Sequence, residues 1–193
     1  MTNDKAKAGD TLGAAVIGNS ITDNKVSAGG VFTVQCFNSD GVLKWETSKH
    51  NLVVNAGLKD MNDKYFSGAT YTAAWYIGIY GAAASNNPAA SDTMLSHIGW
   101  TEVTAYSQAT RPQAVFAAAS AADPSVITNT ASPAVFTING TTTVGGAFLT
   151  SNNTKGGTTG ILFSAADFQS PGDRNVVNGD TINITYTFSL DAA

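Results

Sequence analysis

The ten residues Thr181 to Leu190 alternate between polar and apolar side chains without interruption, directly after the turn sequence Asn178-Gly179-Asp180. Because successive side chains of an extended chain point to opposite faces, this period of two predicts a β-strand with one face on a core. The threonines on the other face are expected to meet water. The predicted core positions are Ile182, Ile184, Tyr186, Phe188 and Leu190.

Short apolar runs separated by Gly, Asn and Pro continue through most of the chain and predict further strands. Asn139-Gly140 between two of these runs is a strong signal for a two-residue hairpin turn. The further predicted strands are Val31 to Phe37, Val42 to Glu46, Asn51 to Val54, Tyr71 to Tyr80, Thr101 to Tyr106, Gln113 to Ala119, Ala134 to Ile138, Thr143 to Thr150 and Gly160 to Ser164.

One helix is expected among these strands. Asn55 is suited to cap its amino terminus, and Leu58, Met61 and Tyr65 follow at spacings of three and four, which predicts a face packed against the sheet. No strand–helix–strand alternation is present. The predicted fold is therefore all-β: an antiparallel β-sandwich, of jelly-roll or immunoglobulin-like topology, with one short helix and an extended N-terminal arm.

Residues 1–30 contain no aromatic side chain and cannot bury much surface alone. Such a segment is either unfolded in the isolated protein or becomes ordered as an arm against a neighbouring subunit. The predicted organisation is an arm over residues 1–30 and a single β-sandwich domain over residues 31–193. The apolar positions of the arm, which are the candidate contact residues, are Leu12, Val16, Ile17, Ile21 and Val26.

The charge pattern argues against several function classes. Charged residues make up 12% of the chain, the net charge is −4, and the cations after residue 64 are Arg111, Lys155 and Arg174. Nucleic-acid binding needs clustered cations, so no nucleic-acid partner is expected. Cys36 is the single cysteine, which excludes an intramolecular disulfide and a cysteine-based metal cluster.

The amino terminus, Met1 to Lys7, lacks the apolar stretch of a signal peptide, and no apolar run reaches the length that spans a bilayer. We therefore expect synthesis in the cytoplasm and no membrane partner.

No arrangement of residues indicates catalysis. His50 and His97 lie far apart without metal-ligand spacing, and Glu46 and Glu102 are the only glutamates. The Gly-x-Ser-x-Gly motif of serine hydrolases is absent from the sequence. We expect no enzymatic activity, no cofactor and no metal.

The three tryptophans are the natural candidates for a sugar-binding aromatic residue. Trp45 and Trp75 lie in predicted strands and favour core packing, whereas Trp100, beside Gly99 and a long loop, is a candidate exposed binding aromatic. Two loops, Gly81 to Ser96 and Ser151 to Thr159, are long enough for a binding role, and the second is expected to be flexible.

The stretch Phe37 to Glu46, followed by His50 to Leu58, resembles small virion structural proteins of tailed bacteriophages and prophages. The similarity covers almost everything after residue 30 and brings no functional residues with it. It continues through Trp75-Tyr76-Ile77-Gly78, Gly99-Trp100-Thr101-Glu102, Arg111-Pro112 and Gly179 to Leu190.

The resemblance implies a head decoration or cement protein on the capsid surface of the virion. Its partners would be the major capsid protein and other copies of itself. Alternatives are a tail, adaptor or fibre component with receptor-binding loops, or a carbohydrate-binding module.

Overall fold

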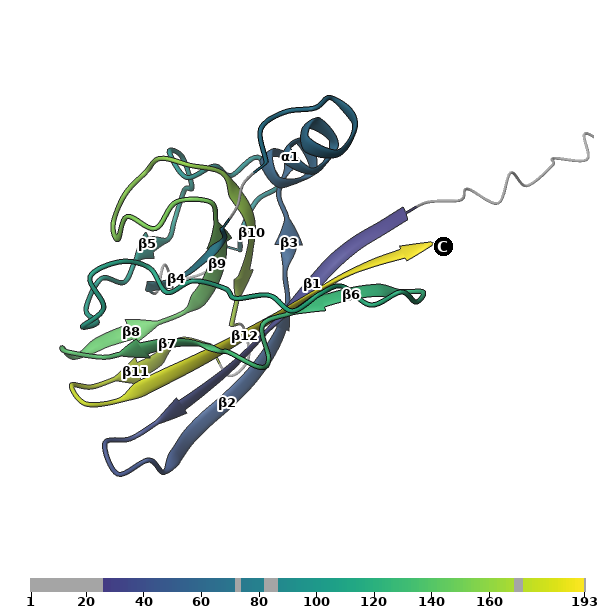
Figure 1. Cartoon of the computed structure of the whole chain (residues 1–193). Coiled ribbons are helices and arrows are strands. Elements are labelled where there is room, and N and C mark those ends of the chain that lie inside the picture. The colour runs from purple at the N-terminus through teal and green to yellow at the C-terminus, as the bar shows by residue number, and fades with distance from the viewer. Residues whose placement is uncertain (1–25, 72–73, 82–86, 169–171, 193) are drawn as a thin grey trace, which may run out of the picture.

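The computed structural model describes residues 26–71, 74–81, 87–168 and 172–192. Its strands form two antiparallel sheets that face each other across a hydrophobic core, with helix α1 beside β10 and β3 (Figure 1). The prediction of an all-β, sandwich-like fold is confirmed, and the described residues contain one helix.

The first sheet is built around β1 and β12, which pair along all 12 residues of each strand. It contains β2 (Leu43–His50), β1 (Val26–Phe37), β12 (Thr181–Ala192) and β6 (Ser125–Thr128) in this order, and β7 (Ala134–Thr137) pairs further along the same edge of β12. The predicted first and last strands are thus neighbours at its centre.

The second sheet lies opposite the first. Its order is β3 (Leu52–Val53), β10 (Leu162–Asp167), β9 (Gly146–Thr150), β4 (Tyr76–Gly81) and β5 (Thr101–Glu102). A separate two-stranded sheet joins β11 (Arg174–Val176) to β8 (Thr142–Val144).

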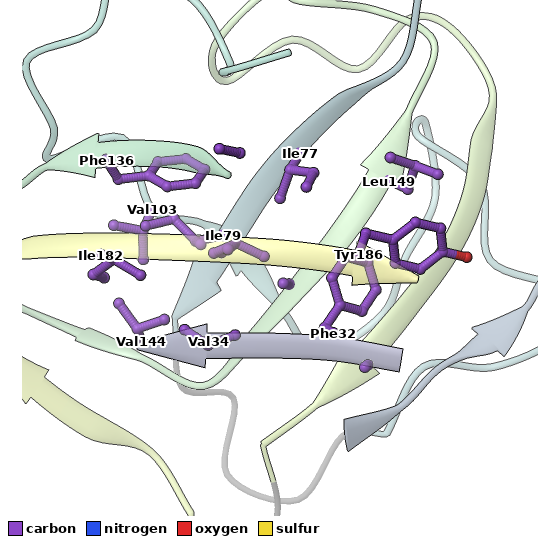
Figure 2. Close-up of a cluster of buried hydrophobic side chains, with 14 of the residues drawn as sticks. Phe32, Val34, Ile77, Ile79, Val103, Phe136, Val144, Leu149, Ile182 and Tyr186 are labelled. Carbon is purple, nitrogen blue, oxygen red and sulfur yellow. The ribbon is translucent and has the colours of Figure 1, made fainter. Parts of the chain in front are cut away.

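Apolar side chains from both sheets meet in the main core, as Figure 2 shows. Alternate residues of β12 confirm the predicted pattern, because Ile182, Ile184 and Tyr186 are completely buried. Phe188 and Leu190 are half-buried instead. Phe188 still packs on Phe163 of β10, and β12 continues beyond it into a part that projects past the second sheet (Figure 1). Other core residues are Phe32 and Val34 of β1, Phe136 of β7, Ile77 and Ile79 of β4 and Leu149 of β9.

The second sheet is also covered on its other face. Tyr80, Met94, Trp100, Phe148 and Leu162 form a smaller buried cluster there. Burial on both faces explains why all five residues of β9 are buried and why this strand shows no polar alternation.

Helix α1 (Asn55–Phe66) is present, but its predicted capping residue and part of its predicted packed face are wrong. The cap position is Val54, without a side-chain cap, and Asn55 is already helical. Gly57 makes the close contact with the sheet, because a Cβ atom there would collide with the backbone of Phe163. Tyr65 is 84% exposed and Leu58 is 41% exposed although both were expected on the packed face, whereas Met61 packs against the core.

Several strand predictions need correction. The predicted strand over Gln113 to Ala119 is reduced to a single bridge between Gln113 and Tyr76. The Asn139-Gly140 hairpin is wrong, since the strands flanking it pair with β12 and β11 and not with each other. Strands β6 and β11 were not predicted because each is a short segment without clear alternation.

Candidate functional site

A three-stranded ribbon projects beyond the end of the second sheet (Figure 1). β1 pairs with β12 from Val26↔Ala192 inwards, whereas its ladder with β2 begins at Val31↔His50. β6 covers the other edge of β12. In the described part of the chain, residues 26–29 of β1 therefore have a strand on one side only.

The backbone groups on this open side belong to alternate residues. Gly30 faces β2, since its N–H donates to Asn51 Oδ1 at 2.6 Å and its carbonyl accepts from Asn51 N at 2.9 Å. Because successive residues of a strand point their N–H and C=O groups to opposite sides, those of Ala28 and Val26 face the same way as those of Gly30. They form the open edge.

A polar junction fixes the point at which the ribbon leaves the body. Asn51 Nδ2 donates to the Tyr186 hydroxyl at 2.7 Å, and Ser164 Oγ lies 3.2 Å from the same oxygen. Gly30 is needed here, because a Cβ atom would lie 2.8 Å from Thr187 O. The junction connects the two sheets at the point where the ribbon begins to project beyond the second sheet.

Val26 is the one predicted arm residue that lies in the described ranges. Val26 is the first residue of β1, five residues before the predicted strand start, and its side chain is 70% exposed at the tip of the ribbon. Residues 26–30 therefore belong to the first sheet and not to the arm. Leu12, Val16, Ile17 and Ile21 lie outside the described residues.

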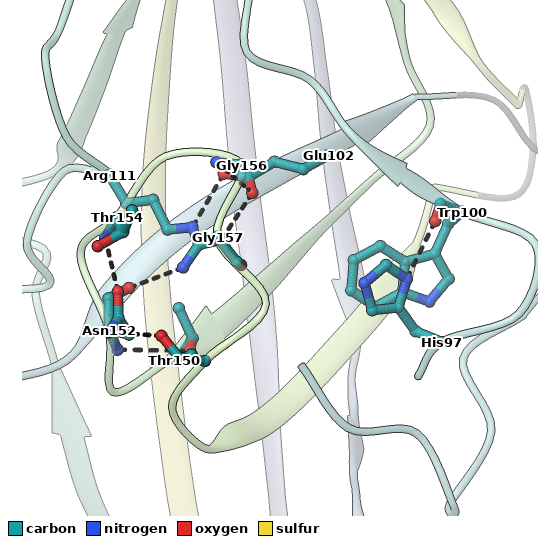
Figure 3. A network of polar contacts seen from close by, with 10 residues as sticks. His97, Trp100, Glu102, Arg111, Thr150, Asn152, Thr154, Gly156 and Gly157 are labelled. Atoms are coloured by element: carbon teal, nitrogen blue, oxygen red, sulfur yellow. Dashed lines mark hydrogen bonds and ion pairs between the residues drawn. The ribbon is translucent and has the colours of Figure 1, made fainter. Parts of the chain in front are cut away.

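Trp100 is not the exposed aromatic that the sequence allowed, because only 3% of it is accessible. Its indole stacks on His97 with ring centroids 3.7 Å apart (Figure 3). It also contacts the rings of Tyr80 and Phe148. Its Nε1 is 3.4 Å from Asp92 Oδ2. Trp100 anchors the loop that carries it and offers no face to a sugar.

The same loop presents two large aliphatic side chains to solvent. Leu95 is 79% exposed and Ile98 is 85% exposed, on either side of the anchored His97. Thr93 and Ser96 close the turn that carries Leu95 through backbone and side-chain hydrogen bonds. This loop tip, Leu95 to Ile98, therefore exposes apolar surface that the sequence did not predict.

The loop after β9 was expected to be flexible, but a buried arginine organises it. Arg111 is 1% exposed and forms two hydrogen bonds to the Glu102 carboxylate, at 2.9 and 2.6 Å. Its guanidinium also donates to the carbonyls of Asn152 and Gly157, as Figure 3 shows. Lys155 donates to two further carbonyls across the loop. The pair holds the loop in one conformation.

The two histidines and the cysteine have different surroundings. His97 packs on Trp100, and His50 lines a shallow surface hollow of about 420 Å³ with Asn51 and Pro88. Burial raises the pKa of the Cys36 thiol to about 11. Among the residues that the structure describes, no three His, Cys, Asp or Glu side chains lie close enough to hold a metal.

No helix in the described ranges is both long and apolar enough to cross a bilayer. Comparisons with protein-family models, with curated proteins and with solved structures found no match for this chain.

Proposed function

We propose that this protein is a structural component of a tailed-phage virion that binds the outer surface of the head as a decoration protein. It acts by binding neighbouring proteins and carries out no chemical reaction. The resemblance of residues 37–58 and 179–190 to virion structural proteins supports the virion setting. The partners in this proposal are the major capsid protein and neighbouring copies.

The observation that carries the proposal is the projecting ribbon of β1, β12 and β6. Residues 1–25 lead directly into its tip at Val26, which is mostly exposed. A strand that continues from the body toward an N-terminal segment without aromatic side chains is suited to reach an adjacent subunit. Extended segments of this kind gain main-chain hydrogen bonds with little demand on sequence.

Copy number in purified particles tests the location. Quantitative mass spectrometry should find the protein in hundreds of copies per particle, in a fixed ratio to the major capsid protein. Deletion of residues 2–25 should leave the sandwich folded and reduce occupancy on the head at least tenfold. Full occupancy of the deletion variant would contradict the role of the N-terminal segment.

A tail or adaptor component is the second candidate, and the loop tip favours it. Leu95 and Ile98 are exposed on an anchored loop, and the Arg111 pair holds another loop in place. Loops held in this way suit receptor binding. Six or twelve copies per particle would select this function.

A further inference from the structure

We propose that the open edge of β1, residues 26–29, accepts an extended strand from the major capsid protein. This inference rests on the proposed function and names the contact by which it is carried out. The added strand would lie next to β1 on the side where β2 is absent. The first sheet would then contain a strand of the shell beside the strands of this protein.

The chemistry of this edge distinguishes it from the other free edge of the same sheet. β2 is an edge strand with Lys44, Glu46 and Lys49, and charged side chains of this kind discourage pairing with other chains. Residues 26–30 read Val-Ser-Ala-Gly-Gly and carry no charge. Small, neutral side chains leave the backbone open to a close approach.

The inner face of the ribbon, on which the side chains of residues 26 and 28 lie, is partly apolar. A partner strand should therefore be apolar on the same face. Residues 26 and 28 share the face of Phe32, which is completely buried in the core. Leu190 of β12 pairs with Ala28, and Ile127 of β6 lies one strand further on the same face; both are half-buried. An added strand with alternate apolar residues would continue this half-covered surface.

The outer face supplies a charge preference. Asp191 of β12 is the ionisable side chain beside the open edge, whereas Asp123 lies on the far side of β12 and accepts the N–H of Ala192 at 3.1 Å. Asp191 pairs with Ser27 across the ladder. A Lys or Arg opposite Ser27 on an added strand would lie about 10 Å away, two strand spacings, so its long side chain can approach the carboxylate. We therefore infer a partner strand with basic residues on its outer face.

Paired variants of Ala28 test the edge. Ala28→Pro removes the outward N–H and places a ring on the edge, but leaves the β1–β12 hydrogen bonds of Ser27 and Gly29 intact. Ala28→Ser keeps the N–H and is the matched control. In a pelleting assay with isolated capsid shells, Ala28→Pro should weaken binding at least tenfold and Ala28→Ser less than twofold.

Amide hydrogen exchange in the wild-type complex gives an independent result. Exchange at Val26 and Ala28 should slow at least tenfold on shell binding, whereas Ser27 and Gly29, bonded to β12, should change little. Asp191→Asn should weaken binding about two- to fivefold at low salt and have no effect at high salt.

The outcomes separate the two proposals. Failure of the wild-type chain to bind shells refutes the proposed function, and the strand-addition site with it. Shell binding that Ala28→Pro retains, with unchanged exchange at Ala28, leaves the function standing and overturns the site. Concentration-dependent protection of Ala28 without shells would assign the edge to a second copy and also overturn it. If Ala28→Pro does not fold, the exchange measurement decides.

Discussion

The side-chain amide of Asn51 donates a 2.7 Å hydrogen bond to the hydroxyl of Tyr186, a completely buried residue at the centre of the first sheet. The same side chain accepts the N–H of Gly30 through Oδ1. One residue between β2 and β3 therefore satisfies polar groups of both β1 and β12. It determines where the ribbon leaves the sandwich.

Asn51→Ala should lower the free energy of unfolding by about 1–3 kcal/mol, because Gly30 N–H loses its partner and the Tyr186 hydroxyl keeps only Ser164. Asn51→Asp should cost less, since its carboxylate can accept both hydrogen bonds. Urea denaturation followed by tryptophan fluorescence measures both variants. Equal losses in the two would show that the acceptor role of the side chain is not important.

Glu102→Gln should destabilise the fold by about 3–5 kcal/mol, because the buried charge of Arg111 loses its anionic partner. The double variant Glu102→Gln with Arg111→Met should recover part of this loss. Both should expose Lys155 to trypsin in limited proteolysis, since its hydrogen bonds depend on the loop conformation. Unchanged resistance at Lys155 would mean that the pair does not hold the loop.

Trp100→Ala should cost about 3–5 kcal/mol of stability, as for other buried large aromatic side chains, and Trp100→Phe should cost less. Leu95→Ala and Ile98→Ala are matched controls on the same loop and should change stability by less than about 0.5 kcal/mol, since both side chains are exposed. Thermal unfolding compares the four variants. A stable Trp100→Ala protein that has lost glycan binding would contradict this structural role and would support a sugar-binding site at Trp100.

The Cys36 thiol predicts a pH dependence. Burial, with a smaller contribution from Asp180, raises its folded-state pKa from 9.0 to about 11. Between these values the unfolded chain releases the proton and the folded chain keeps it, so stability should fall as pH rises through this range. Cys36→Ala should reduce this slope between pH of about 9 and 10, measured by urea denaturation. An unchanged slope would contradict the assigned thiol pKa.

Sequence alternation predicted the centre of the first sheet, because β12 is buried on one face and its apolar residues repeat with period two. β9 and β10 overlap strands predicted from short apolar runs and not from alternation, because they are buried on both faces and contain small residues such as Ala147 and Ala165. The face of α1 was also misread. Gly57 makes the closest contact, and apolar periodicity does not record a residue that packs through its missing side chain.

The candidate site was predictable only in part. An N-terminal segment without aromatic side chains, leading into the first strand, can be recognised from composition. The open edge of β1 depends on where β2 begins to pair, and that position is set by Asn51, far away in sequence. Burial of Trp100 depends on Tyr80, Phe148 and His97, which the fold brings together.

Thermal disruption of isolated capsid shells tests the central claim most directly. Under the proposed function, shells of the encoding phage should bind the full chain to saturation in hundreds of copies. Their disruption temperature should rise, because a ligand that binds the assembled state stabilises it. The variant lacking residues 2–25 should produce a much smaller rise at equal concentration. Shells that neither bind the full chain nor change in disruption temperature would contradict the account.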